Sequence, residues 1–369
     1  MEPNVDLIGI NGGVGSVANS LISNGRLNVG AMRPFMAEDG KAYMSVYLGG
    51  PANQASSYKV MQVNAATLRR DEWKQLDDVV LEVSRQRLGG VQDLIDKNLT
   101  FNLGNAMGTT VLEWHDISDA FEADLTMDGI SRAKNDRVVY QHNYLPIPII
   151  HVDYQINART LEASRSMGNP LDTTSVERAT RKVQEKLEKM LFTNTSYSFG
   201  EKDSRNNNSI YSYVNHPDRN ITTFTYGHWD DLENSTNDSI GEKIVNDVVK
   251  MKKISMAAFH YGPWMLYIPS AYETILDKDY DSTAQTTIRE RILKIGGITG
   301  IKTVDYLTAD NVLLVQMTSD VVRLVRGLPI QNVEWDTEGK FVTNYKVMTI
   351  QVPQIRSDQN KKSGIVHMA

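Results

Sequence analysis

The best candidates for a metal site or for acid–base catalysis are two pairs, each of a histidine and a carboxylate. His151 and Asp153 stand two positions apart on an expected strand, so their side chains share one face. His115 and Asp116 are adjacent in the expected partner strand. A metal site needs three or four converging ligands, and neither pair supplies more than two. We therefore interpret both pairs as polar residues at a subunit contact.

The other candidates for catalysis are weaker still. His260 lies among Phe259, Tyr261 and Trp264, which favours a packed or hydrogen-bonded histidine. The sequence shows no Ser–His–Asp order and no nucleophile elbow. Asp and Glu are abundant, but no pair has a spacing that demands acid–base work. We expect no catalytic residues and no metal ligands.

A glycine-rich segment near the start, LIGINGGVGSVANSLI, is patterned like a strand, a glycine loop and a helix. Its glycines at 9, 12, 13 and 15 do not fit the dinucleotide-binding spacing, because residues 16–18 lack the third glycine. No strand ending in an acidic residue follows at about twenty residues, as the ribose contact of that motif requires. We interpret the segment as a flexible arm and expect no cofactor.

Composition excludes several classes of protein. The chain has 369 residues, 41% hydrophobic and 23% charged, with a formal net charge of −6 and a pI near 5.7. These fractions are ordinary for a folded protein, and the acidic balance argues against a dedicated nucleic-acid binder. Local Lys and Arg still allow weak contact with DNA. The absence of cysteine excludes disulfides, thiolate nucleophiles and cysteine zinc sites.

Targeting signals are not recognisable either. Residues 1–21 lack the basic stretch followed by an apolar one that a signal peptide needs, so we expect no secretory leader. No run of about 18 apolar residues occurs, so we expect no helix that spans a membrane.

The elements that would position these residues begin with an irregular stretch. Residues 1–70 show no sustained periodicity and are expected to form an extended arm. A helix is expected over 71–88, ended by Gly89 and Gly90, with a second short helix after it. Residues 109–160 contain strands around a polar turn, and Pro146 and Pro148 make the second strand an edge or irregular. A two-stranded excursion is not stable alone in water, so it should pack on another chain.

The second half of the chain is more regular. Residues 173–193 predict the clearest helix, with an apolar stripe and a capping-box spacing between Thr174 and Glu177. Residues 194–239 are rich in Asn, Ser and Asp and are expected to be a surface insertion with one hairpin. A mixed α/β region follows from residue 240, with a short buried strand expected at WMLYI (264–268) and another strand at NVLLVQM (311–317). The chain ends in a long strand and a polar tail. Helices and strands are segregated rather than alternating, which favours the α+β class.

Three runs of this sequence carry a resemblance to a known family. Residues 145–192, 261–307 and 312–358 resemble encapsulins and related phage capsid proteins in the order of their elements and in local sequence. The similarity covers roughly residues 70 to 369 and includes no catalytic signature. It implies the Hong Kong 97-type capsid fold. The long N-terminal arm departs from encapsulins, which usually lack one, and this favours a major capsid protein of a tailed bacteriophage.

The resemblance also implies a division of the chain into parts. The first three parts are an N-terminal arm (1–70), the first part of a peripheral domain (71–108) and an extended β-hairpin loop (109–160). The next part, 161–239, belongs to the peripheral domain and contains the long spine helix (173–193) and a polar insertion (194–239). A mixed α/β axial domain (240–314) follows, and the chain then returns to the peripheral domain and ends there (315–369). Some capsids of this fold join a loop lysine to an asparagine of a neighbouring subunit. Here Lys134, in the turn of the loop, and Asn332 or Asn344 are the candidates.

The expected function is therefore structural and not enzymatic. Many copies would assemble into hexamers and pentamers of an icosahedral head around double-stranded DNA, in a virion assembled in the host cytoplasm. Expected partners are the chain itself, decoration, scaffolding and portal proteins, and packaged DNA through non-specific contacts, with no membrane. One alternative is an encapsulin-type compartment shell. A second, from another class, is a soluble α+β enzyme with an N-terminal nucleotide loop.

Overall fold

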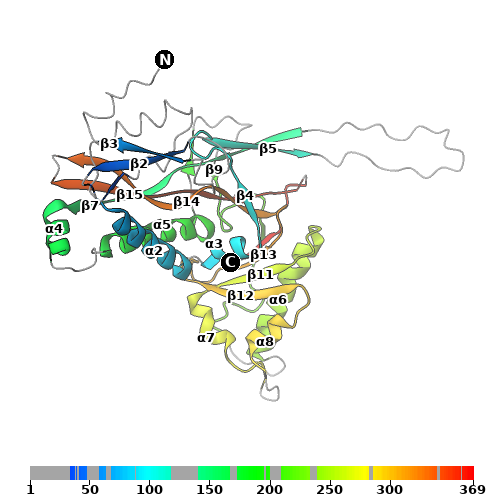
Figure 1. The fold of residues 1–369 in the computed structure, drawn as a ribbon. Coiled ribbons are helices and arrows are strands. Elements are labelled where there is room, and N and C mark those ends of the chain that lie inside the picture. The colour runs from blue at the N-terminus through cyan, green and yellow to red at the C-terminus, as the bar shows by residue number, and fades with distance from the viewer. Residues whose placement is uncertain are drawn as a thin grey trace, which may run out of the picture.

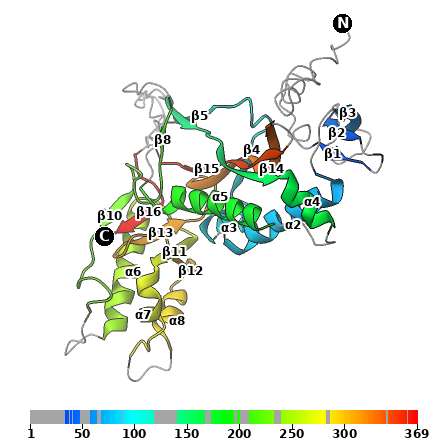
Figure 2. The ribbon, with the colours of Figure 1, turned by 90° about the vertical axis from the view of Figure 1, so that its left-hand side faces the viewer.

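The chain folds into two lobes, each built on one sheet, with a long hairpin projecting from the first lobe (Figures 1 and 2). In this computed structural model a sheet of four strands organises what we call the four-stranded lobe, and a sheet of five strands organises the five-stranded lobe. Helices and strands are segregated within both lobes, as expected for an α+β protein. The structure describes residues 34–37, 39, 41–47, 58–63, 68–87, 89–117, 140–166, 173–194, 197–199, 209–232, 239–281, 286–338, 341–358 and 360–369.

The four-stranded lobe has the strand order β4-β14-β15-β7. Its centre is the antiparallel pair β14 and β15, with β7 antiparallel on one side and β4 parallel on the other. Three helices pack against this sheet, and α4 continues from the end of β7. The elements are α2 (Arg70–Arg87), α3 (Gly89–Asp96), β4 (Thr100–Asn102), β7 (Ile150–Asn157), α4 (Ala158–Ser166), α5 (Thr174–Phe192), β14 (Val322–Glu338) and β15 (Val342–Ile355).

Helix α5 forms because its apolar residues recur at helical spacing and face the core. Val183, Leu187 and Leu191 are fully buried, whereas charged residues fill the outer face. The predicted capping box is wrong in detail. Thr173 is the N-cap residue and caps no backbone amide; its hydroxyl instead donates to the Glu177 carboxylate at 3.1 Å. Burial of the apolar stripe, rather than N-terminal capping, stabilises the helix.

The five-stranded lobe has the strand order β10-β16-β13-β11-β12. Strands β11 and β13 are buried along their whole length, in agreement with their continuous apolar sequences. Helix α6 begins with a capping box, in which Ser239 and Glu242 satisfy each other's backbone amides. The elements are β10 (Asn220–Thr222), α6 (Ile240–Ala257), β11 (Trp264–Pro269), η4 (Ser270–Tyr272), α7 (Glu273–Leu276), α8 (Ile288–Leu293), β12 (Ile298–Val304), β13 (Val312–Gln316) and β16 (Ile365–Met368).

Three small sheets complete the described chain. Strands β5 (Val111–Ile117) and β6 (Tyr140–Pro146) form the antiparallel hairpin, which extends away from both lobes in Figure 1. Strands β8 (Tyr197–Ser198) and β9 (Ser209–Ile210) form a short hairpin. Strands β1 (Phe35–Met36), β2 (Ala42–Tyr47) and β3 (Tyr58–Val63) form a three-stranded antiparallel sheet.

Four expectations about boundaries need correction. Part of the arm expected over 1–70 is a sheet, joined to the core where the Trp73 indole donates to the Pro34 carbonyl at 2.8 Å. Strand β7 was expected in the loop 109–160, but it pairs with β15, because β6 ends at Pro146 and Pro148 interrupts the chain before β7. The expected loop therefore shrinks to the β5–β6 hairpin and the chain between its strands.

The other two corrections concern segments thought to be polar. Residues 194–239 are more than a surface insertion, because Tyr213 and Trp229 are buried in the two cores and β10 joins the five-stranded sheet. The end of the stretch 315–369 does not stay with the four-stranded sheet. Strand β16 runs between β10 and β13, so the C-terminus closes the five-stranded sheet.

Candidate functional sites: the hairpin, apolar surfaces and buried polar groups

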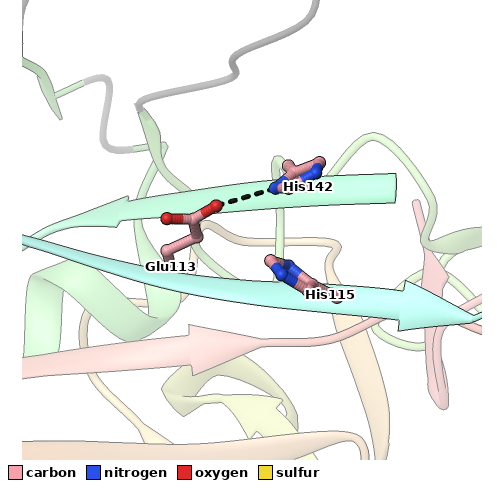
Figure 3. A group of neighbouring side chains, drawn as sticks. All are labelled: Glu113, His115 and His142. Atoms are coloured by element: carbon pink, nitrogen blue, oxygen red, sulfur yellow. Dashed lines mark hydrogen bonds and ion pairs between the residues drawn. The ribbon is translucent and has the colours of Figure 1, made fainter. Parts of the chain in front are cut away.

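The β5–β6 hairpin brings together three side chains that can ligate a metal. His115 lies directly opposite His142 in the antiparallel register, and Glu113 lies two residues before His115 on the same face. The Nδ1 atom of His142 is 2.7 Å from Oε1 of Glu113, and the two imidazole centroids are 4.3 Å apart. One ligand atom from each residue lies within 4.8 Å of the others (Figure 3). This cluster was not predicted from the sequence.

The histidine pairs singled out in the sequence do not form such a group. Nδ1 of His151 is 3.5 Å from Asp153, whose carboxylate is also 3.5 Å from Nζ of Lys346. His115 finds its neighbours across the hairpin, and the side chain of Asp116 lies outside the described part. His260 is buried, as predicted, and its Nε2 is 3.4 Å from the carbonyl of Lys362.

The residues proposed for an inter-subunit cross-link lie in different settings. Asn332 and Asn344 both sit in the four-stranded sheet and are buried within the chain, at 0% and 6% exposure. The Asn332 amide donates to the Tyr154 hydroxyl at 2.5 Å. Lys134 lies outside the described residues, as do the glycines of the proposed nucleotide loop. The cross-link stays a prediction.

A buried polar group lies where the two lobes meet. Asp93 of α3 is 4% exposed. Its carboxylate forms an ion pair with Nζ of Lys302 at 2.5 Å and accepts a hydrogen bond from the Tyr267 hydroxyl at 3.1 Å. Close to it, the carboxylate of Glu188 accepts the Gly90 amide at 2.8 Å, at the start of α3. Burial raises the pKa of Glu188, and the Gly90 amide opposes that shift. The sequence gives no local signal for this group, because its members are far apart along the chain.

A second buried group anchors the C-terminal strand. Nδ1 of His367 accepts from Nε of Arg219 at 3.2 Å, and its Nε2 lies 2.6 Å from Oδ1 of Asn311. His216 is close by in sequence to Arg219, and its Nδ1 accepts from the Asp218 amide at 3.2 Å. Burial lowers the pKa of both histidines to about 4, and the charge of Arg219 adds to the effect. Both imidazoles are therefore neutral at neutral pH.

Large apolar side chains are exposed on both lobes. Phe259 and Tyr261, in the turn between α6 and β11, are 72% and 64% exposed, and Phe341, in the turn between β14 and β15, is 75% exposed. A hollow of about 430 Å³ lies beside α5. It is lined by Pro148, Ile149, Ile150, His151, Val152, Lys182, Lys186, Met190, Tyr197 and Ile210. Contiguous exposed apolar surface is typical of contact sites, and the hollow beside α5 has several apolar side chains in its lining.

The fold defines a class of protein. The structure is similar to the virus-like particle protein from Pyrococcus furiosus, with 17% identity and a TM-score of 0.56, over 80% of this chain and 99% of that one. It is also similar to the capsid protein of Myoviridae Phage XM1, with 9% identity and a TM-score of 0.56, over 77% of this chain and 92% of that one. The fold is thus the Hong Kong 97-type capsid fold that the sequence resemblance implied.

The family is given by the sequence itself. Residues 64–368 match a family of unknown function, DUF6260, and the chain belongs to that family. A search of curated protein sequences finds no match. None of the helices that the structure describes is both long and apolar enough to cross a membrane.

Proposed function

We propose that this chain is the major capsid protein of a tailed bacteriophage, which self-assembles into hexamers and pentamers of an icosahedral head enclosing double-stranded DNA. The observation that carries the proposal is the fold, which is shared over nearly the full length of two shell-forming proteins. In this role the five-stranded lobe is the axial domain, the four-stranded lobe is the peripheral domain with α5 as its spine, and the β5–β6 hairpin is the extended loop.

The exposed apolar surfaces support this role. They lie on both lobes, and the hollow beside α5 adds a third, so one subunit offers separate surfaces to several neighbours. Several weak contacts per subunit add to a large total when a closed shell forms. The hairpin supports it too, since a two-stranded ribbon gains stability from packing against another chain. The occupant of these surfaces is a second copy of this chain.

The remaining parts of the proposal follow from the same role. The function is structural, without a catalytic step. Partners beyond the chain itself are decoration, scaffolding and portal proteins, and DNA is held by non-specific contacts, in keeping with an acidic chain. The virion is assembled in the host cytoplasm. An encapsulin-type compartment shell uses the same fold and is the second candidate, favoured by the similarity to the Pyrococcus particle.

Negative-stain electron microscopy of the purified chain, with light scattering on the same sample, tests the proposal. We expect closed particles, rings or capsomer-sized oligomers. Nucleic acid inside closed particles indicates a phage head, and a protein cargo without it indicates a compartment. A compact dimer that also binds a nucleotide specifically would contradict both and favour the enzyme alternative.

A pair of variants links the particles to the apolar surfaces. Replacing Phe259 and Tyr261 together by Ser should abolish particles while leaving the circular dichroism spectrum of the subunit unchanged, because neither side chain is part of a core. Val249→Ser is the matched control, since this residue is an isolated exposed apolar side chain on the same lobe, 45% exposed. Particles that form equally well with both changes would contradict a role of the Phe259 surface in assembly.

A further inference from the structure

We propose that Glu113, His115 and His142 form a binding site for a divalent transition-metal ion of the zinc class on the β5–β6 hairpin. The antiparallel register creates the site, because it places His115 and His142 directly opposite each other. The alternation of a strand then brings Glu113 to the same face. Figure 3 shows the three side chains gathered on one side of the two strands.

The donor set is one that zinc uses. Two imidazole nitrogens and one carboxylate leave a fourth tetrahedral position for water or another ligand. Tetrahedral ligands at zinc distances stand about 3.3 Å apart. The carboxylate of Glu113 and Nδ1 of His142 are 2.7 Å apart, and one ligand atom from each of the three residues lies within 4.8 Å of the others. A bound ion would bring these atoms to the tetrahedral spacing.

The surroundings of Glu113 hold its carboxylate in place. It is hydrogen-bonded to His142 at 2.7 Å and also to Tyr144. Tyr144 lies directly opposite Glu113 in the hairpin register. A partner that orients a ligating carboxylate from behind is typical of metal sites and strengthens binding. A bound metal ion would take the place of the present hydrogen bond between His142 and Glu113.

Such an ion would join the two strands of the hairpin. His115 comes from β5 and His142 from β6, on either side of the chain segment 118–139 that connects them. A two-stranded ribbon is only marginally stable by itself, and a metal bound to both strands stabilises the folded form by its own binding free energy. The site would therefore fix the pairing of the two strands.

Calorimetric titration of the full-length, tag-free chain with Zn²⁺ near neutral pH tests the proposal. We expect one ion per chain, and a loss of affinity of about tenfold or more for His142→Asn and for Glu113→Gln. The matched control is His151→Asn, because His151 is also an exposed strand histidine beside a carboxylate but belongs to no group of three potential ligands among the described residues. This control should bind as the wild type does.

Two further readouts make the result specific. Co²⁺ bound to the wild-type chain should show the intense visible bands of a tetrahedral site, and these should vanish in His142→Asn. Affinity should fall as the solution is acidified, since protons compete for the imidazoles. Binding that is absent from the wild type, or equally weak in the wild type and all three variants, would show an adventitious ion only and overturn the proposal.

Discussion

Acidification should weaken the C-terminal strand of the five-stranded sheet, because two buried histidines must stay neutral there. His367 is 5% exposed and has both ring nitrogens engaged: Nδ1 accepts from Arg219, and Nε2 faces the Asn311 oxygen. A proton on Nδ1 would remove that acceptor and set a second positive charge against Arg219. His216 is 6% exposed, and protonation of its Nδ1 would likewise break the hydrogen bond that this atom accepts from the Asp218 amide. The folded chain therefore resists protonation at both residues.

The size of the effect follows from the two pKa values. Burial lowers the pKa of each histidine from 6.5 to about 4. The folded pKa is then below the unfolded one, so the unfolded chain binds more protons between these values, and the free energy of unfolding falls as the pH falls through that window. Relative to neutral pH, the titration of each histidine lowers the free energy of unfolding by about 2 kcal/mol at about pH 5. The stabilisation is fully present above the unfolded pKa.

Urea unfolding of the dissociated subunit, at neutral pH and at about pH 5, measures this effect. The comparison is between the wild type, His367→Gln and the control His151→Gln, whose histidine is exposed on β7. On acidification the His367 variant should lose about 2 kcal/mol less than the wild type, and the control should lose as much as the wild type. The decisive quantity is the change in the free energy of unfolding between the two pH values, because any effect of the substitution that is the same at both pH values cancels from it. An unaltered loss in His367→Gln would refute the reasoning.

Three more predictions rest on single contacts. Leu187→Ala removes a fully buried side chain from α5 and should lower the free energy of unfolding by about 2–5 kcal/mol, measured by denaturant titration. Glu188 has a raised folded pKa, so its charge destabilises the fold as the pH rises above the usual glutamate pKa; Glu188→Gln should be more stable than the wild type at neutral pH, with a difference that shrinks on acidification. If Lys134 is joined to Asn332 or Asn344 of a neighbour, boiled particles should give multimer bands on an SDS gel that Lys134→Ala removes, and a monomer band alone would exclude the bond.

The elements that the sequence predicted well are those whose pattern is local. Helix α5 carries an apolar stripe over nineteen residues, and its bounds differ from the prediction by one residue at each end. Strands β11 and β13 are continuous apolar runs that fit only a buried strand of this length. Each of these patterns is long enough to determine the element by itself.

The elements that were missed depend on distant partners. Strand β16 has four residues after a polar stretch, and only its place between β10 and β13 makes it part of a sheet. Strand β10 has three residues and pairs in parallel with β16, nearly 150 positions along the chain. Segments this short carry too little periodicity to be told from loops.

The metal-ligating cluster was missed for a related reason. Glu113 and His142 are 29 positions apart, and their contact depends on the register of the hairpin. A shift of one residue would turn one strand's side chains to the other face. The usable signal was the alternation of Glu113 and His115 on β5, combined with a histidine on β6. The sequence analysis considered His115 with its neighbour Asp116 instead.

The polar group at Asp93 determines which part of the subunit can adapt. Asp93 belongs to the four-stranded lobe, whereas Lys302 and Tyr267 belong to the five-stranded lobe, and Lys97 adds a contact across the same boundary to Thr299 at 3.0 Å. Separating the lobes would break all of these contacts and expose the Asp93 carboxylate to water. The end of the β5–β6 hairpin nearest the four-stranded lobe is held by apolar packing, with Leu145 buried in the core and Leu112 and Trp114 packed against it. A subunit that fits both five-fold and six-fold rings, as proposed, would therefore adjust outside the contact between the two lobes.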